Sequence, residues 1–270
     1  MTHQGIMAGK RGLIVGLAND HSLAWGIAQA LQAQGAELAF TYQNEALQKR
    51  VEPLGRTLGA EIFLPCDVSD EGQMASVFDH LKGTWGSLDF VLHAVGFSNK
   101  DELKGLYMDT SHANFLHTMD VSCYSFTRMC RLAAPLMNEG GALLTLTYLG
   151  AERVMPHYNV MGVAKAALEA SVRYLACDLG PRGVRVNALS AGPARTLAAS
   201  GIGDFRYILK WNQDNAPLRR NVTLEDVGGA AMYLLSPLSS AVTGETHHVD
   251  CGYHVVGMKA VDAPDISLPQ

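Results

Sequence analysis

Residues 11–28 read RGLIVGLANDHSLAWGIA, and this stretch indicates the fold of the chain. The apolar run that ends at Val15 is typical of a buried strand, and Gly16 allows a sharp turn directly after it. Ser22 stands where a helix would begin, and Gly26 would let that helix approach the sheet closely. Free backbone N–H groups and the helix dipole at such an N-terminus favour a pyrophosphate. The stretch is not a GxGxxG motif, so an ordinary strand, turn and helix with Ser22 as N-cap is an equally weighted alternative.

Apolar runs and helical patterns alternate along the whole chain. Continuous apolar runs are typical of strands covered on both faces, and their alternation with helices indicates βαβ units. The expected strands span residues 11–16, 37–42, 61–67, 88–96, 142–147, 184–190 and 246–250. The expected helices include residues 23–34, 73–85, 122–137 and 158–179. The pattern predicts an α/β fold, a Rossmann-type doubly wound sheet of seven parallel strands with helices on both faces. Because no linker or repeat interrupts it, we expect one dinucleotide-binding and catalytic domain over residues 1–270.

The composition argues against several classes of protein. The net charge is −5, and Lys and Arg form no basic stripe of the kind that binds nucleic acid. The five cysteines are odd in number and contain no CxxC pair, which favours reduced cytoplasmic thiols. Neither a signal peptide nor a membrane span is evident. These features together predict a cytoplasmic protein. His247 and His248 have no Cys or carboxylate at ligand spacing, so we expect no metal site.

Candidate cofactor contacts follow successive strands, and ligands of parallel sheets bind at the carboxyl ends of strands. Gln43 follows the second strand and can hydrogen-bond the adenosine. Neither a ribose-binding acid nor an Arg for a 2′-phosphate stands beside it, and we favour NADH over NADPH. Asp67, after the third strand, can accept from the adenine amine or cap the next helix. Gly96, after the fourth, would let the backbone approach the nicotinamide ribose.

Tyr148, Tyr158 and Lys165 follow the fifth strand. Tyr158 and Lys165 lie two helical turns apart, about 10.5 Å along a helix axis, so one can reach a substrate while the other holds the cofactor ribose. Hydride addition to an α,β-unsaturated thioester places negative charge on the carbonyl oxygen, to which a phenol can donate. A nearby ammonium is expected to lower the pKa of that phenol. Surface residues on an amphipathic helix are the alternative, which the position after the fifth strand disfavours.

The chain resembles the short-chain dehydrogenase/reductases, and among them the enoyl-(acyl carrier protein) reductases. Ordinary members have Tyr-x3-Lys with a Ser thirteen residues before the Tyr. Here Met161 stands four residues before Lys165, and Tyr148 stands thirteen residues before Met161, so Tyr158-x6-Lys165 replaces the ordinary arrangement. The resemblance covers nearly the whole chain, and its other matching segments are Gly16-x5-Ser22-x-Ala24-x-Gly26, residues 40–43 (FTYQ), residues 187–193 (NALSAGP) and residues 195–198 (RTLA).

The resemblance implies NADH-dependent reduction of the trans-2 double bond of enoyl-acyl carrier protein thioesters in fatty-acid elongation. Tyr158 would then stabilise the enolate, Lys165 would bind the nicotinamide ribose, and Tyr148 would be a second active-site tyrosine. Either tyrosine can be the formal proton donor. The resemblance also implies acyl carrier protein as partner and a homotetramer. Together with Gly16, Gly96 and Lys165, the expected cofactor contacts are Ser22, Leu23, Gln43, Asp67, Val68, Val95, Ala194, Arg195, Thr196, Leu197 and Ala198.

Residues 196–217 are predicted to form a flap over the substrate. Gly201 and Gly203 loosen the chain, and Phe205 and Ile208 follow at helical spacing. Such side chains can cover an acyl chain or pack in the core. The resemblance favours a substrate-binding loop that becomes ordered when the cofactor is present.

Further substrate contacts are expected at Ser98, Tyr148 and Tyr158, although enoyl reductases would carry a small apolar residue at the position of Ser98. Three basic residues offer electrostatic steering of an acidic carrier protein, but a solvated basic edge is the favoured interpretation. These are Lys210, Arg219 and Arg220.

Two other functions fit parts of the pattern. A short-chain reductase acting on ketones, dienoyl thioesters or sterol-like substrates would normally need the Ser and Tyr-x3-Lys arrangement, against which Met161 argues. A non-catalytic nucleotide-binding protein could keep the same fold. The presence of both tyrosines together with Lys165 argues against that reading.

Overall fold

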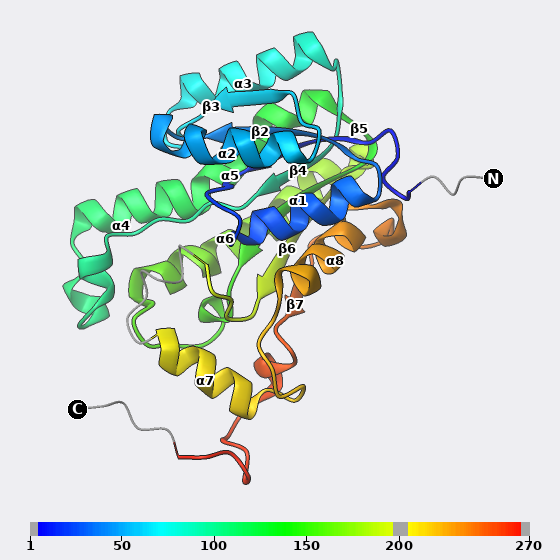
Figure 1. The fold of residues 1–270 in the computed structure, drawn as a ribbon. Coiled ribbons are helices and arrows are strands. Elements are labelled where there is room, and N and C mark those ends of the chain that lie inside the picture. The colour runs from blue at the N-terminus through cyan, green and yellow to red at the C-terminus, as the bar shows by residue number, and fades with distance from the viewer. Residues whose placement is uncertain (1–4, 197–204, 266–270) are drawn as a thin grey trace.

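Seven parallel strands form one sheet in the order β3-β2-β1-β4-β5-β6-β7 (Figure 1). The computed structural model describes residues 5–196 and 205–265. Strand order reverses between β1 and β4, which is the switch point of a doubly wound sheet. The strands are β1 (Arg11–Val15), β2 (Glu37–Tyr42), β3 (Ile62–Pro65), β4 (Leu88–His93), β5 (Met137–Thr147), β6 (Arg185–Ala191) and β7 (Thr246–Val249). The predicted α/β class and its parallel seven-stranded sheet are confirmed.

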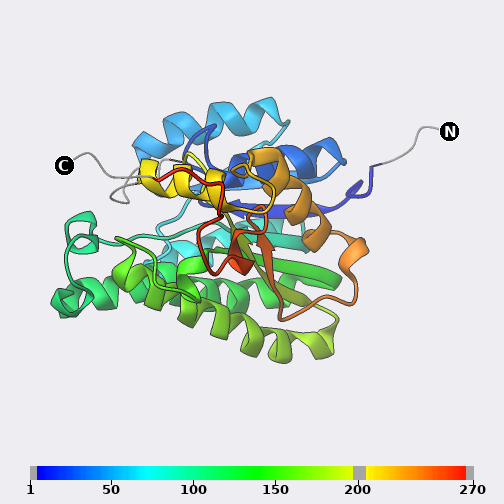
Figure 2. The same ribbon diagram turned by 90° about the horizontal axis from the view of Figure 1, so that it is seen from below.

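Helices cover both faces of this sheet (Figure 2). One face packs against α1 (Leu23–Ala33), α2 (Glu45–Thr57) and α8 (Leu224–Leu235). The other packs against α3 (Glu71–Thr84), α5 (Ser125–Ala133) and α6 (Asn159–Leu179). Two further helices, α4 (His112–Met119) and α7 (Phe205–Asn215), lie beyond the edges of these layers (Figure 1). No helix in the described ranges is long and apolar enough to cross a membrane.

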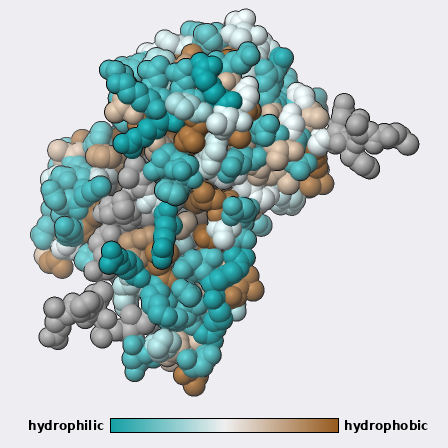
Figure 3. Space-filling model, viewed as in Figure 1, coloured by the Kyte–Doolittle hydropathy of each residue, from teal (hydrophilic) through white to brown (hydrophobic). Residues whose placement is uncertain are grey.

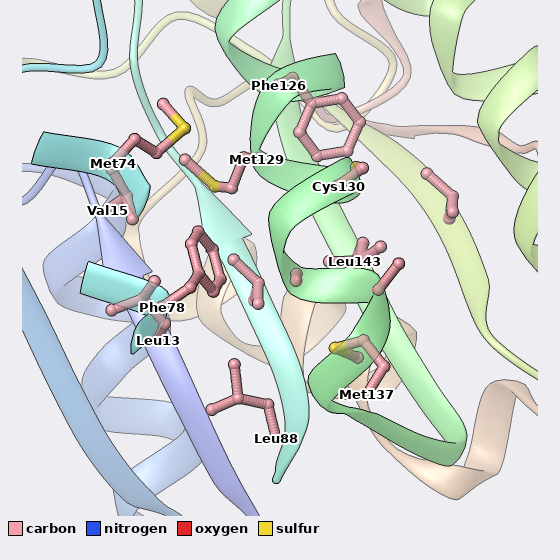
Figure 4. Packing of buried hydrophobic residues seen from close by; sticks show 14 of the residues in the cluster. Leu13, Val15, Met74, Phe78, Leu88, Phe126, Met129, Cys130, Met137 and Leu143 are labelled. Atoms are coloured by element: carbon pink, nitrogen blue, oxygen red, sulfur yellow. The ribbon is translucent and has the colours of Figure 1, made fainter. Parts of the chain in front are cut away.

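The core on the α3–α5 side is built from the apolar runs that indicated the strands. Leu13 of β1 and Leu143 of β5 meet Phe78 of α3 and Phe126 of α5, and all four are almost inaccessible to solvent (Figure 4). Side chains alternate between the faces of a strand, so a strand covered on both faces must be apolar at successive positions. This explains the continuous apolar runs in the sequence.

The expected helix over residues 122–137 is confirmed in position, although the helical stretch begins earlier and is not α-helical throughout. A π-helical turn, Asp120–Tyr124, joins α4 to α5, and α5 ends at Ala133. β5 then begins at Met137, which pairs with Leu88 of β4 before the register shifts. The remaining predicted strands and helices are confirmed within a few residues at their ends.

Two residues of the opening stretch act differently from the prediction. The Ser22 hydroxyl makes no capping bond to α1 and accepts from the backbone N–H groups of Ala18 and Asn19 instead. Gly26 brings α1 close to another helix, since a Cβ there would stand 2.5 Å from the carbonyl oxygen of Leu224 in α8. α1 and α8 lie side by side in Figures 1 and 2.

We therefore expect Gly26→Ala to lower the free energy of unfolding by about 1–3 kcal/mol, because the extra methyl group forces α1 and α8 apart. Gly229→Ala is the matched control, since nothing lies within 4 Å of a Cβ at that position of α8. There, alanine improves helix propensity and should raise stability by up to ~1 kcal/mol. Urea denaturation of both variants measures the difference. Equal or greater stability of Gly26→Ala would contradict the close packing.

Candidate active site

The carboxyl ends of the central strands border a cavity of about 660 Å³. Its lining begins with the turns after β1, β2 and β3 and continues to the first turns of α6 and α7. In Figure 3, hydrophobic atoms show between hydrophilic patches in the middle of the face shown in Figure 1. A large and partly apolar cavity at the switch point of such a sheet is the expected place for a dinucleotide and a substrate.

The turn after β1 is tight because of Gly16. Its φ of +102° lies in the region that favours glycine, and a Cβ would stand 2.2 Å from the carbonyl oxygen of Ala94. Ser22 then fixes the turn through the N–H groups of Ala18 and Asn19, at 3.2 and 3.0 Å. The N-terminus of α1 therefore faces the cavity without a side-chain cap, which suits an anionic pyrophosphate.

Gln43 and Asp67 meet at the ends of β2 and β3. Gln43 Nε2 donates to Asp67 Oδ2 over 2.9 Å. Asp67 does not cap α3, because Asp70 does so by accepting from Gln73 N. Although partial burial opposes ionisation, hydrogen bonds from Ser69 and Gln43 lower the pKa of Asp67. A charged carboxylate therefore remains at the cavity wall, where it can accept from an adenine amine.

Lys165 is an ammonium donor within the cavity wall. Its side chain is only 6% exposed, and Nζ donates to the carbonyl oxygens of Leu146 and Val95 over 2.9 and 3.5 Å. A Cβ on Gly96 would stand 3.6 Å from the same Nζ, which is an ordinary van der Waals distance, so Gly96 lies next to the ammonium without being required there by steric contact. Burial lowers the pKa of Lys165 to about 8. The ammonium is the main form at neutral pH, and it loses its proton more easily than a surface lysine does.

Tyr148 and Tyr158 stand edge to face, with ring centroids 5.1 Å apart. Burial, with smaller contributions from Tyr148 and Glu169, raises the pKa of Tyr158 well above its ordinary value. The expectation that a nearby ammonium lowers the pKa of this phenol is therefore wrong, because desolvation of the phenolate sets the direction of the shift. Both phenols are neutral hydrogen-bond donors at physiological pH. The Tyr148 hydroxyl is buried and has no hydrogen-bond partner among the residues that the structure describes.

The end of the cavity next to α7 is partly apolar. Phe205 and Ile208 of α7 line it together with Met161, the residue that occupies the position of the ordinary catalytic tyrosine. Ser98 also lines it, but its hydroxyl accepts from Thr118 Oγ1 over 2.9 Å and from Asn114 Nδ2 over 3.2 Å. Both donors belong to α4, so the hydroxyl is hydrogen-bonded although it is buried. A polar residue can therefore occupy the position at which an apolar residue was expected.

Most of the residues singled out from the sequence meet around this cavity. The lining includes Gly16, Ser22, Leu23, Gln43, Asp67, Val68, Val95, Gly96, Ser98, Tyr148, Tyr158, Lys165, Ala194, Thr196, Phe205 and Ile208. Arg195 is exposed and stands outside the lining. Leu197 and Ala198 lie outside the described residues.

The three basic residues considered for steering are each paired with a carboxylate. Lys210 Nζ contacts Asp214 Oδ1 over 2.7 Å, Arg219 contacts Asp262 over 2.7 Å, and Arg220 contacts Asp226. Pairing cancels much of the field that these cations would present to an acidic partner. The favoured interpretation of a solvated edge fits this arrangement.

A buried support beneath the cavity was not predicted. His93 ends β4 with Nδ1 2.9 Å from Thr145 Oγ1 and Nε2 2.8 Å from Ser125 Oγ, and burial lowers its pKa to about 3. Ser125 donates to Val121 O in the π-helical turn, so neutral His93 donates through Nε2. Within the turn, Ser122 Oγ bonds both backbone groups of Phe97. Nothing in the residue order signals this turn, because it depends on tertiary hydrogen bonds.

Comparisons with known proteins agree with this geometry. The family model described as Enoyl-(Acyl carrier protein) reductase matches residues 16–254. Enoyl-acyl-carrier-protein reductase (NADH) 1 of Rhizobium meliloti strain 1021 is 67% identical over 264 residues, which cover 98% of this chain and 97% of that protein. The reductase of Anaplasma phagocytophilum in complex with NAD is 62% identical, with a TM-score of 0.93, and the match covers 98% of this chain and 100% of that chain. The Bacillus cereus enzyme with NADP+ and indole naphthyridinone is 50% identical, with a TM-score of 0.92 and coverage of 94% and 100%. The chain therefore belongs to the family of the enoyl-(acyl carrier protein) reductases.

Proposed function

We propose that this chain reduces the trans-2 double bond of enoyl-acyl carrier protein thioesters to the saturated acyl thioester, with Tyr158, Tyr148 and Lys165 as its active-site residues. One observation carries the assignment of residues. Two neutral phenols, one of them buried without a protein partner, share a single cavity with a buried ammonium. Phenol donors beside a partly apolar cavity are suited to stabilise an oxygen that becomes negative during reaction.

NADH supplies the hydride. Residues at the carboxyl ends of the strands would bind the NADH molecule. Gly16 and the uncapped N-terminus of α1 suit the pyrophosphate, and Asp67 suits the adenine amine. Lys165 suits the nicotinamide ribose, where its ammonium can donate to hydroxyl groups. A 2′-phosphate near Gln43 would bring a second negative charge toward Asp67, which supports NADH over NADPH.

Tyr158 donates a hydrogen bond to the thioester carbonyl oxygen as this oxygen gains negative charge. Its raised pKa keeps the proton on the phenol until that moment. Tyr148 packs against the ring of Tyr158 and lines the same cavity, so either phenol is a candidate to pass a proton to the enolate. The apolar side chains of α7 line the cavity and exclude water from the acyl chain. Of the predicted flap over residues 196–217, residues 197–204 lie outside the described part of the chain.

The same proposal includes a cytoplasmic homotetramer. All five cysteines lie in the described part of the chain and are free, as in a reducing compartment. α6 turns Val163 and Tyr174 outward, and Tyr174 is 77% exposed. Small residues between them, Ala167 and Ala170, allow a second helix to approach closely. Sedimentation equilibrium tests the assembly, and a monomer at micromolar concentration would contradict it.

The reaction is tested by following oxidation of reduced nicotinamide with crotonyl and longer trans-2-enoyl thioesters, on acyl carrier protein and on coenzyme A. We expect turnover with the enoyl thioesters and a higher kcat/KM for NADH than for NADPH. A matched panel of ketones and 3-ketoacyl thioesters should give none. Turnover confined to the ketones, or bound NADH that no enoyl thioester oxidises, would contradict the proposal.

An alkaline limb near pH 8 should appear in kcat/KM for NADH. This parameter reports groups in the free enzyme, where the pKa of Lys165 is about 8. Below that pH the ammonium is present and binds the cofactor, and above it the charge is lost, so kcat/KM falls as pH rises. Tyr158→Phe should keep the same limb, because the phenol does not titrate in this range. A flat profile up to pH 10 would contradict the role of Lys165.

A further inference from the structure

The backbone on both sides of Tyr158 is left-handed. His157 has a φ of +56° and Asn159 a φ of +36°, although neither residue is glycine. Asn159 is also the first residue of α6, so the helix begins from a conformation that side-chain-bearing residues rarely adopt. Tyr158 thus projects from a bend that needs support from neighbouring structure to persist.

Asn159 provides a connection to a loop distant in sequence. Its Nδ2 lies 3.4 Å from the carbonyl oxygen of Glu102, 3.2 Å from that of Leu103 and 3.3 Å from that of Gly105. The two hydrogens of one amide group are shared among three carbonyl acceptors. A single side chain therefore forms hydrogen bonds to three peptide groups of this loop.

The connected loop in turn contributes Leu103 to the apolar surroundings of Tyr158. Leu103 is 6% exposed and belongs to the small apolar cluster of Tyr158, Val160 and Met161, and it also lines the cavity. Glu102 connects the loop to the N-terminus of α4. Its carboxylate accepts hydrogen bonds from the backbone N and the Oγ of Ser111, the N-cap of α4, over 2.8 and 3.0 Å. The loop is therefore held from the N-cap of α4 and from α6, with Leu103 between them in the same apolar cluster as Tyr158.

We propose that Asn159 is a positioning residue for the reaction, which through its amide holds the 102–105 loop and Leu103 against Tyr158 and so fixes the phenol relative to the substrate. This inference rests on the proposed role of Tyr158. Misplacement of a reacting group by a fraction of an ångström is enough to slow catalysis without preventing substrate or cofactor from binding.

Two variants separate the amide contacts from backbone strain. Asn159→Gly accepts a positive φ freely but removes the amide. Asn159→Asp keeps the shape and the tolerance of a positive φ, but turns a carboxylate oxygen toward three carbonyl oxygens. Asn138→Ala is the control, since that amide donates to Asp89 at the opposite end of β5. Steady-state kinetics with an enoyl thioester, NADH affinity by fluorescence and thermal melting are measured for each.

We expect kcat to fall by about 10-fold to 10²-fold in Asn159→Gly and in Asn159→Asp, with NADH affinity within about twofold of wild type. Asn138→Ala should keep wild-type kcat. In a Tyr158→Phe background, the further loss from Asn159→Gly should shrink to about twofold, because the group being positioned is already gone.

Wild-type kcat in both Asn159 variants would overturn the proposal. An undiminished loss in the Tyr158→Phe background would also overturn it, because Asn159 would then act on something else. If Asn159→Gly does not fold, Asn159→Asp decides alone. A Tyr158→Phe enzyme with full kcat would mark failure of the proposed role of Tyr158, which is distinguishable from a failure of the Asn159 contacts alone.

Discussion

Lys165→Ala should lower kcat/KM for NADH by at least about 10³-fold. The ammonium lies within the cavity wall, held by the carbonyl oxygens of Leu146 and Val95, where low dielectric strengthens its interaction with the cofactor. The alanine variant loses both the charge and its three donors. Initial rates of NADH oxidation with an enoyl thioester and NADH affinity by fluorescence measure the loss.

Lys165→Met controls for packing, because it keeps a long side chain without the charge. We expect the same loss of activity, with an unchanged or higher melting temperature at neutral pH. A buried ammonium carries a desolvation penalty, which is visible in its pKa of about 8. Activity within tenfold of wild type in either variant would show that another group holds the cofactor.

Tyr158→Phe should lower kcat with an enoyl thioester by about 10²-fold to 10³-fold, the usual cost of removing one donor to a developing oxyanion. NADH affinity should stay within about twofold, because the hydroxyl is removed while the ring remains packed against Tyr148 and Leu103. Stopped-flow measurement of the hydride-transfer step shows whether chemistry itself is slowed.

Tyr148→Phe distinguishes the two phenols. Its hydroxyl has no protein partner to lose, so the substitution leaves no buried group unpaired. A larger loss of kcat in Tyr148→Phe than in Tyr158→Phe would reassign the main donor to Tyr148. Unchanged kcat in both single variants would contradict any role of a phenol in stabilising the enolate.

The sheet could be predicted from the sequence because burial on both faces leaves apolar runs, as at residues 13–15 of β1 and residues 90–92 of β4. The start of β5 could not be predicted in this way. Residues 138–141 read NEGG, which suggests a turn, yet Met137 pairs with Leu88 because the tertiary structure places it there. Local signals did exist for two helices that were not predicted. Asn44 caps α2, and Thr223 with Asp226 forms a capping box at α8.

The residues that line the cavity were largely predictable, whereas their pKa values and hydrogen bonds were not. Residues directly after the strands meet at one edge of a parallel sheet whatever the details of packing, so Gln43 and Asp67 were found. The raised pKa of Tyr158 depends on how deeply the phenol is buried, which residue order does not state. Likewise, the contacts of Asn159 join segments more than fifty residues apart, and no local pattern encodes them.

Single turnover with NADH deuterated at the transferable position tests the central claim most directly. The wild-type protein is mixed with one equivalent of a trans-2-enoyl-acyl carrier protein, and the acyl chain is released and weighed by mass spectrometry. We predict a saturated acyl chain that carries one deuterium. An unchanged enoyl chain in the presence of bound NADH, or deuterium found only in a hydroxyacyl product from a ketone, would contradict the assignment.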